Sequence, residues 1–101
     1  MQHIGLQRES EFGDVLANFD EGSSIDQRIT LRAASESAVL RFIDPYGTTI
    51  INQLQLPQLI AELRGLISTA EEQDFRENVD HLVLFLEASK GPHVYVRFVG
   101  D

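Results

Sequence analysis

The sequence contains no cysteine, and this absence removes several kinds of chemistry together. Disulfides, thiolate nucleophiles, zinc ribbons and iron–sulfur clusters all require Cys side chains. Long apolar runs are also missing, since no stretch approaches the roughly 18 residues that a membrane span needs. The first twelve residues, MQHIGLQRESEF, lack the basic segment and apolar core of a secretory signal. We therefore expect a cytoplasmic protein that does not contact the membrane.

Basic residues are scarce. Seven Arg and the single Lys90 stand against 16 Asp and Glu, which gives a formal net charge of −8 at pH 7. The Arg are scattered and form no basic stripe of the kind that binds phosphates, so nucleic acid is not an expected partner. The acids gather in two blocks, with a local charge of −6 over residues 9–26 and of −5 over residues 71–87. An acidic surface keeps a small protein soluble, and it can also face a basic partner.

The remaining composition is that of a soluble globular protein, with 43% hydrophobic and 24% charged residues. A chain of 101 residues supplies enough apolar surface for one core and too little for two. The sequence has no internal repeat, no linker and no low-complexity tract. It therefore predicts a single globular domain over residues 1–101.

The first third of the chain predicts short elements. Alternating apolar residues indicate a strand over residues 3–7. Apolar residues at helical spacing around Gly13 predict a short helix over residues 13–19. Residues 24–34 fit two structures. Their alternation is typical of a half-buried strand, whereas Ser24 followed by a Gln three residues later is a capping box that favours a helix.

The middle of the chain predicts a hairpin. Residues 38–43 alternate as a strand does, and residues 48–52 form a second short strand. Between them, the sequence DPYG has the residues that a type I turn prefers, with Asp44 first, Pro second and Gly last. We expect an antiparallel hairpin over residues 38–52.

Two long helices are predicted after this hairpin. Pro57 suits the first turn of a helix, and the apolar stripe that follows it has the spacing of a core-facing helix. Gly65 inside that helix suggests close packing against a neighbour. The second helix begins at Thr69 or at Asp74, because each has an acid three residues later that completes a capping box.

The second long helix carries more apolar residues than one sheet needs. Leu84 and Phe85 widen its apolar face, which indicates either a packed neighbouring helix or a patch for a second copy of the chain. A final strand follows over residues 93–99. Together these elements predict an α+β fold, a small and mostly antiparallel sheet of about four strands packed against two long C-terminal helices and shorter N-terminal helices.

The sequence does not indicate a group of residues that could act together in catalysis. The three His are far apart, and Glu77 with His81 supplies at most two metal ligands on one helix face. The Ser residues fall in loops or at helix ends, where capping and turn formation are their usual roles. We therefore expect no enzyme activity, no metal and no cofactor.

Two stretches, FIDPYGTTIINQLQLPQLIAEL and PHVYVRFVGD, resemble a family of small acidic bacterial proteins in which the two occur in this order. Members are similar in size and charge to the immunity proteins encoded beside polymorphic or contact-delivered toxins. This chain has Thr48 where the family pattern more often has an acid. The resemblance implies tight binding to a cognate toxin domain, and it carries over no functional residues.

Two functions follow as hypotheses. The first is an immunity protein that covers a basic, nucleic-acid- or nucleotide-directed toxin domain, with its acids speeding association. The second is a self-associating structural or regulatory module that uses the apolar face around Leu84 and Phe85, in the form of a homodimer. The candidate partner-binding residues are the acids of the two blocks and the polar pair of the DPYG turn: Asp14, Asp20, Glu21, Asp44, Tyr46, Glu71, Glu72, Asp74, Glu77 and Asp80.

Overall fold

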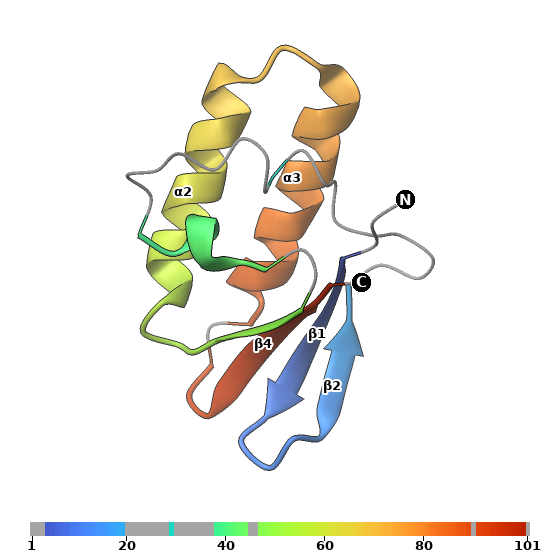
Figure 1. Ribbon diagram of the computed structural model, residues 1–101, viewed down its shortest axis with the longest axis vertical. Helices are drawn as coiled ribbons and strands as arrows, with labels where there is room; N and C mark the ends of the chain where they lie inside the picture. Colours follow the sequence, from blue (N-terminus) through green and yellow to red (C-terminus); the bar gives the residue numbers. More distant parts are fainter. Residues whose placement is uncertain (1–3, 20–28, 30–37, 45–46, 90, 101) are drawn as a thin grey trace.

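The structure is a computed structural model and describes residues 4–19, 29, 38–44, 47–89 and 91–100. Four strands form one antiparallel sheet in the order β2-β1-β4-β3. The strands are β1 (Gly5–Ser10), β2 (Val15–Asn18), β3 (Thr48–Ile51) and β4 (Val94–Val99). Two helices, α2 (Leu56–Thr69) and α3 (Gln73–Glu87), lie side by side on one side of the sheet (Figure 1). The predicted α+β class and the antiparallel sheet are confirmed.

One hydrophobic core lies between the sheet and the two helices. Strand β4 shows the alternation that the sequence predicted, because Val96 and Phe98 are each 1% exposed while Tyr95 points away from the helices. The first and last strands of the chain are neighbours in the sheet, so the core joins the two ends of the sequence. The helices contribute these buried residues: Leu56, Leu59, Ile60, Leu63, Phe75, Val79, Leu82, Val83 and Leu86.

The helix predicted over residues 13–19 is wrong, because this segment forms strand β2 and pairs with β1. Gly13 has a φ of 86°, a left-handed conformation that favours glycine and reverses the chain. The N–H of Ser10 then donates to the carbonyl of Asp14 at 2.9 Å and closes the β1–β2 turn. Of the apolar residues whose spacing suggested a helix, Phe19 is buried and Phe12 is 83% exposed. Pairing with a neighbouring strand overrode the local spacing.

The strand predicted over residues 38–43 is also wrong, and with it the hairpin over residues 38–52. This segment holds a 3-10 helix, η1 (Leu40–Phe42), and β3 pairs with β4 instead. The N–H groups of Ala38 and Leu40 donate to the Glu62 carboxylate of α2, each at 2.7 Å. The N–H of Val39 donates to the same group at 3.2 Å. Because these N–H groups are occupied by a side chain from α2, they are not available to a β-ladder.

The shorter N-terminal helices of the predicted fold are not borne out, since the α-helices with described bounds are α2 and α3. Residues 24–34, for which the sequence left helix and strand open, lie outside the described residues apart from Ile29, which is buried and helical. The turn at Asp44 to Gly47 keeps its backbone hydrogen bond, 3.4 Å from the Gly47 N–H to the Asp44 carbonyl. That turn joins η1 to β3 rather than two strands.

Neither predicted capping box forms at the start of α3. Thr69 is the last residue of α2, and its hydroxyl lies 3.3 Å from the carbonyl of Gly65. The helix α3 begins at Gln73 after its N-cap Glu72, which makes no side-chain capping bond, so Asp74 lies inside the first turn and not at the cap. The close packing suggested for Gly65 is wrong as well, because a Cβ at this exposed position would meet nothing within 4 Å.

Because a Cβ at Gly65 touches no other residue, replacement of Gly65 by Ala measures the effect of helix propensity alone on stability. We expect Gly65→Ala to raise the free energy of unfolding by about 0.5–1 kcal/mol, because Ala loses less backbone entropy in a helix. The matched control is Gly13→Ala, which should lower that free energy because Gly13 has a φ of 86°. Urea unfolding of both variants measures the two changes. Destabilisation by Gly65→Ala would show that the helix packs differently at this position.

The contacts of Glu62 also alter its ionisation. Partial burial raises the pKa of this carboxyl, but hydrogen bonds from the Gln58 amide and from the backbone N–H groups of Leu40, Ala38 and Val39 lower it, and the net result is a pKa below the ordinary value. A folded-state pKa below the unfolded one means that ionised Glu62 stabilises the fold. That contribution is complete above about pH 4.5 and is lost as the pH falls through the folded-state pKa.

We expect Glu62→Gln to lower the free energy of unfolding by about 1 kcal/mol near neutral pH, which is the typical cost of losing a capping acceptor. The difference between the variant and the wild type should shrink as the pH falls through the lowered folded-state pKa of Glu62, because the wild-type carboxylate is then protonated. Urea unfolding at several pH values measures both effects. A difference that stays constant with pH would rule out an ionised Glu62 as the origin of the stabilisation.

Candidate binding surface

An acidic surface lies at the end of the molecule where α2 turns into α3. The connection has Glu71 and Glu72, and the first turns of α3 continue with Asp74, Glu77 and Asp80. All five side chains are exposed. Successive acids three residues apart share one helix face, as Asp74 and Glu77 do, and as Glu77 and Asp80 do. We name these five residues the acidic end.

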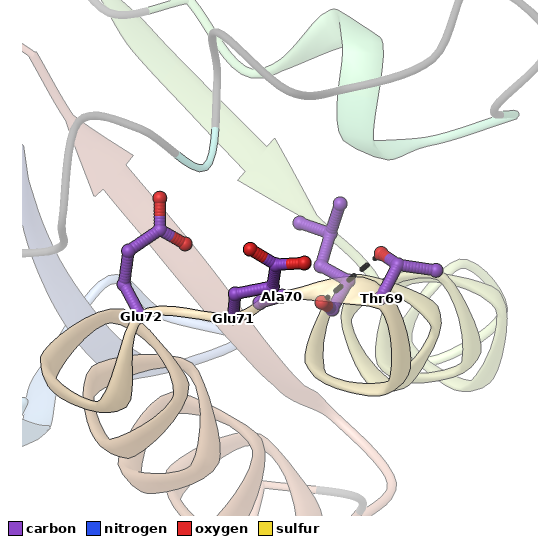
Figure 2. Close-up of a pocket in the computed structure, with 5 residues that line it drawn as sticks. Thr69, Ala70, Glu71 and Glu72 are labelled. Carbon is purple, nitrogen blue, oxygen red and sulfur yellow. Dashed lines mark hydrogen bonds between the residues drawn. The ribbon is translucent and has the colours of Figure 1, made fainter.

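The connection is short and extended, which explains why its acids project into solvent. Figure 2 shows the side chains of Glu71 and Glu72 rising from the same side of the connection. They line an open hollow of about 460 Å³ together with Leu66, Thr69 and Ala70. A second hollow of about 260 Å³ adjoins α3 and is lined by Ile67, Gln73, Arg76, Glu77 and Asp80. The acidic end is thus a shallow, open surface with carboxylates at its rim, and it is not an enclosed cavity.

The other predicted binding residues lie elsewhere. Asp14 belongs to the β1–β2 turn, which lies at the opposite end of the longest axis from the α2–α3 connection (Figure 1). Asp44 precedes β3, whose first residue pairs with Val99, so Asp14 and Asp44 flank opposite ends of the sheet. The structure therefore groups the acids of the second block and separates Asp14 and Asp44 from them.

Three predicted binding residues, Asp20, Glu21 and Tyr46, lie outside the described residues. Within the described ranges, no group of three or more His, Cys, Asp or Glu side chains is placed to hold a metal ion. His81 is exposed on α3, and His93 places its Nδ1 2.8 Å from a carboxylate oxygen of Glu11. No helix in the described part of the chain is long and apolar enough to cross a membrane.

The apolar face predicted around Leu84 and Phe85 divides into two different environments. Leu84 is 61% exposed, whereas Phe85 is partly buried and packs within the molecule. The Phe85 ring meets Phe19 edge-on at 5.6 Å between centroids, and the Arg8 guanidinium lies 4.7 Å from the same ring. Phe85 therefore fills the space between α3 and the strands and does not extend a surface patch with Leu84.

A polar cluster around Arg8 connects β1 to the end of α3, and sequence reasoning missed it. The Arg8 Nε donates to the Ser89 hydroxyl at 2.8 Å, and its Nη2 donates to the carbonyl of Phe85 at 3.3 Å. Ser89 is 1% exposed and donates to the same carbonyl at 2.7 Å. A cation beside the last carbonyls of a helix also complements the helix dipole. The sequence could have indicated this cluster, because Arg8 follows the buried Ile4 and Leu6 at a spacing of two and so faces the helices.

An ion pair lies on the face of the sheet turned away from the helices. Arg97 on β4 donates from Nε to the Glu9 carboxylate on β1 at 2.6 Å. The Glu9 side chain is only 9% exposed, against 37% for the Arg97 side chain. The pair is a charge-assisted hydrogen bond that keeps a nearly buried carboxylate satisfied.

The chain matches no protein-family model, no curated protein and no solved structure.

We expect Ser89→Ala to lower the free energy of unfolding by about 1–3 kcal/mol, because the partly buried Arg8 Nε loses its acceptor. The matched control is Ser68→Ala, since the exposed Ser68 hydroxyl donates to the Gly65 carbonyl at 2.8 Å without holding another group. That control should stay within about 0.5 kcal/mol of the wild type. Equal effects of the two substitutions in urea unfolding would contradict a role for Ser89 in holding Arg8.

Proposed function

We propose that this protein is an immunity-type inhibitor that binds a cognate bacterial toxin domain in the cytoplasm. The observation that carries the proposal is the acidic end, where Glu71, Glu72, Asp74, Glu77 and Asp80 lie exposed within one short stretch of chain. A partner with a basic surface, as expected of a domain that acts on nucleic acid or nucleotides, is attracted to such a surface over long distances. The resemblance to a family of small acidic bacterial proteins, whose members are similar in size and charge to immunity proteins, supports the same proposal.

The shape of the acidic end also fits binding to a protein. Its carboxylates surround shallow hollows of about 460 Å³ and about 260 Å³ that carry the apolar side chains of Leu66 and Ile67. A partner can therefore combine charge pairs at the rim with apolar contact in the centre, which is the usual arrangement of protein interfaces. Inhibition then follows from covering the toxin surface, and it requires no catalytic residue.

Co-expression tests the proposal directly. The probe is the C-terminal domain encoded by the gene immediately upstream, produced in a bacterial host with and without this protein. We expect the host to survive only when this protein is present, and the two chains to co-purify. Absence of protection together with absence of a complex would contradict the proposal.

Charge variants then locate the contact. The double variant Glu71→Gln/Glu77→Gln should slow association with the same domain about tenfold at low salt, because it weakens the attractive field. The control Asp14→Asn/Asp44→Asn removes the same charge from exposed acids outside the acidic end, and it should have a smaller effect. Surface plasmon resonance gives the association rates. Equal slowing by both pairs would show that net charge acts without a specific acidic end.

A further inference from the structure

The outer face of the sheet, which is turned away from α2 and α3, carries exposed apolar residues from three of its strands. The exposed fractions are 51% for Val15, 53% for Leu16, 51% for Ile50, 36% for Tyr95 and 38% for Val99. Residues directly opposite each other in an antiparallel pair share a face. Ile50 lies opposite Arg97, and the bulge in β2 leaves Val15 opposite Glu9. Tyr95 also lies opposite Glu9, so Val15, Ile50 and Tyr95 are neighbours of the Glu9–Arg97 ion pair on this face.

The outer face is also electrically neutral within the four described strands. By alternation its charged residues there are Glu9 and Arg97, and these two are paired at 2.6 Å. The remaining polar positions on this face, such as Gln7 and Asn18, carry no charge. Neutrality is unusual for a surface of this protein, whose formal net charge is −8.

We propose that the outer face of the sheet binds the outer face of a second copy of this chain. The charge distribution selects that occupant. A basic partner is drawn to the acidic end and gains no electrostatic attraction from a neutral face. A second copy carries the same net charge of −8, so it can approach closely only through a surface free of net charge. Apolar residues around a paired charge are self-complementary across a two-fold axis.

The resulting dimer is a four-layer sandwich, with the two sheets in the middle and the helices of each copy outside. Sheets that pack face to face lie about 10 Å apart with interdigitated side chains. Both acidic ends stay on the outside, so dimerisation and the proposed toxin binding use different surfaces. The inference therefore stands or falls independently of the proposed function.

The area of the face predicts a weak dimer. Four strands spaced about 4.8 Å apart, with four to six residues of about 3.3 Å each, give a flat area on the order of 300 Å² per copy. A standard stable interface buries about 800 Å² per partner. Because interfaces of standard size bind at micromolar to picomolar dissociation constants, we expect this smaller one to have a dissociation constant weaker than about 10 µM. Because both copies are acidic, salt screens their repulsion, and we expect several-fold tighter association between about 20 mM and about 500 mM salt.

Sedimentation equilibrium of the purified protein, up to the highest soluble concentration and at both salt levels, tests this inference. Ile50→Glu and Leu16→Glu place a charge on the outer face at half-exposed positions, and each should weaken the dimer at least tenfold while circular dichroism stays native. The matched control is Leu84→Glu, a similarly exposed leucine on α3, which should leave the dimer unchanged.

The following results would overturn the inference: a monomer at every concentration and salt level, a dimer that weakens as salt is added, or a dimer that is lost in Leu84→Glu and kept in Ile50→Glu. The last result would place self-association on α3. Because the experiment uses this chain alone, its failure leaves the co-expression test of toxin binding untouched, and a failed co-expression test leaves the dimer untouched.

Discussion

Burial of one face of a four-stranded sheet beneath α2 and α3 is the constraint on which the rest of the structure depends. The two central strands, β1 and β4, come from opposite ends of the chain, so the core forms only when the whole sequence has been brought together. With both helices on one side, the sheet has an inner face of apolar side chains and an outer face without a covering helix in the described chain. The inner face forms the hydrophobic core, whereas the outer face leaves apolar residues such as Ile50 and Val15 exposed.

Polar side chains hold the irregular segments onto this layered core. Glu62 reaches from α2 to three backbone N–H groups before and within η1, and Arg8 reaches from β1 to the last turn of α3. Each side chain satisfies groups that cannot find partners within their own element, which is the usual requirement at helix ends and in loops. These contacts join residues between 22 and 81 positions apart in the sequence, so they stabilise the tertiary arrangement rather than any single element.

The surfaces available for partners have opposite electrostatic character. The helices α2 and α3 continue beyond the sheet, and the acidic end lies where they join (Figure 1). Its charges are therefore exposed to solvent and act over a long range. The outer face of the sheet is neutral and partly apolar, so it acts only at contact distance. The two interactions that we propose, with a basic partner at the acidic end and with a second copy along the sheet, therefore use different surfaces.

The sequence by itself determined the elements with strong local patterns. These are β4 with its strict alternation, β3 after the DPYG turn and the two long helices with their apolar stripes, together with the acids gathered at residues 71–80. It could not determine the structure of residues 13–19 and 38–43, because partners distant in the sequence decided both. Pairing with β1 made the first a strand, and the Glu62 carboxylate made the second a 3-10 helix. The neutral outer face and the Arg8 cluster likewise emerged only from the tertiary structure, since strand register and helix placement decide which residues meet.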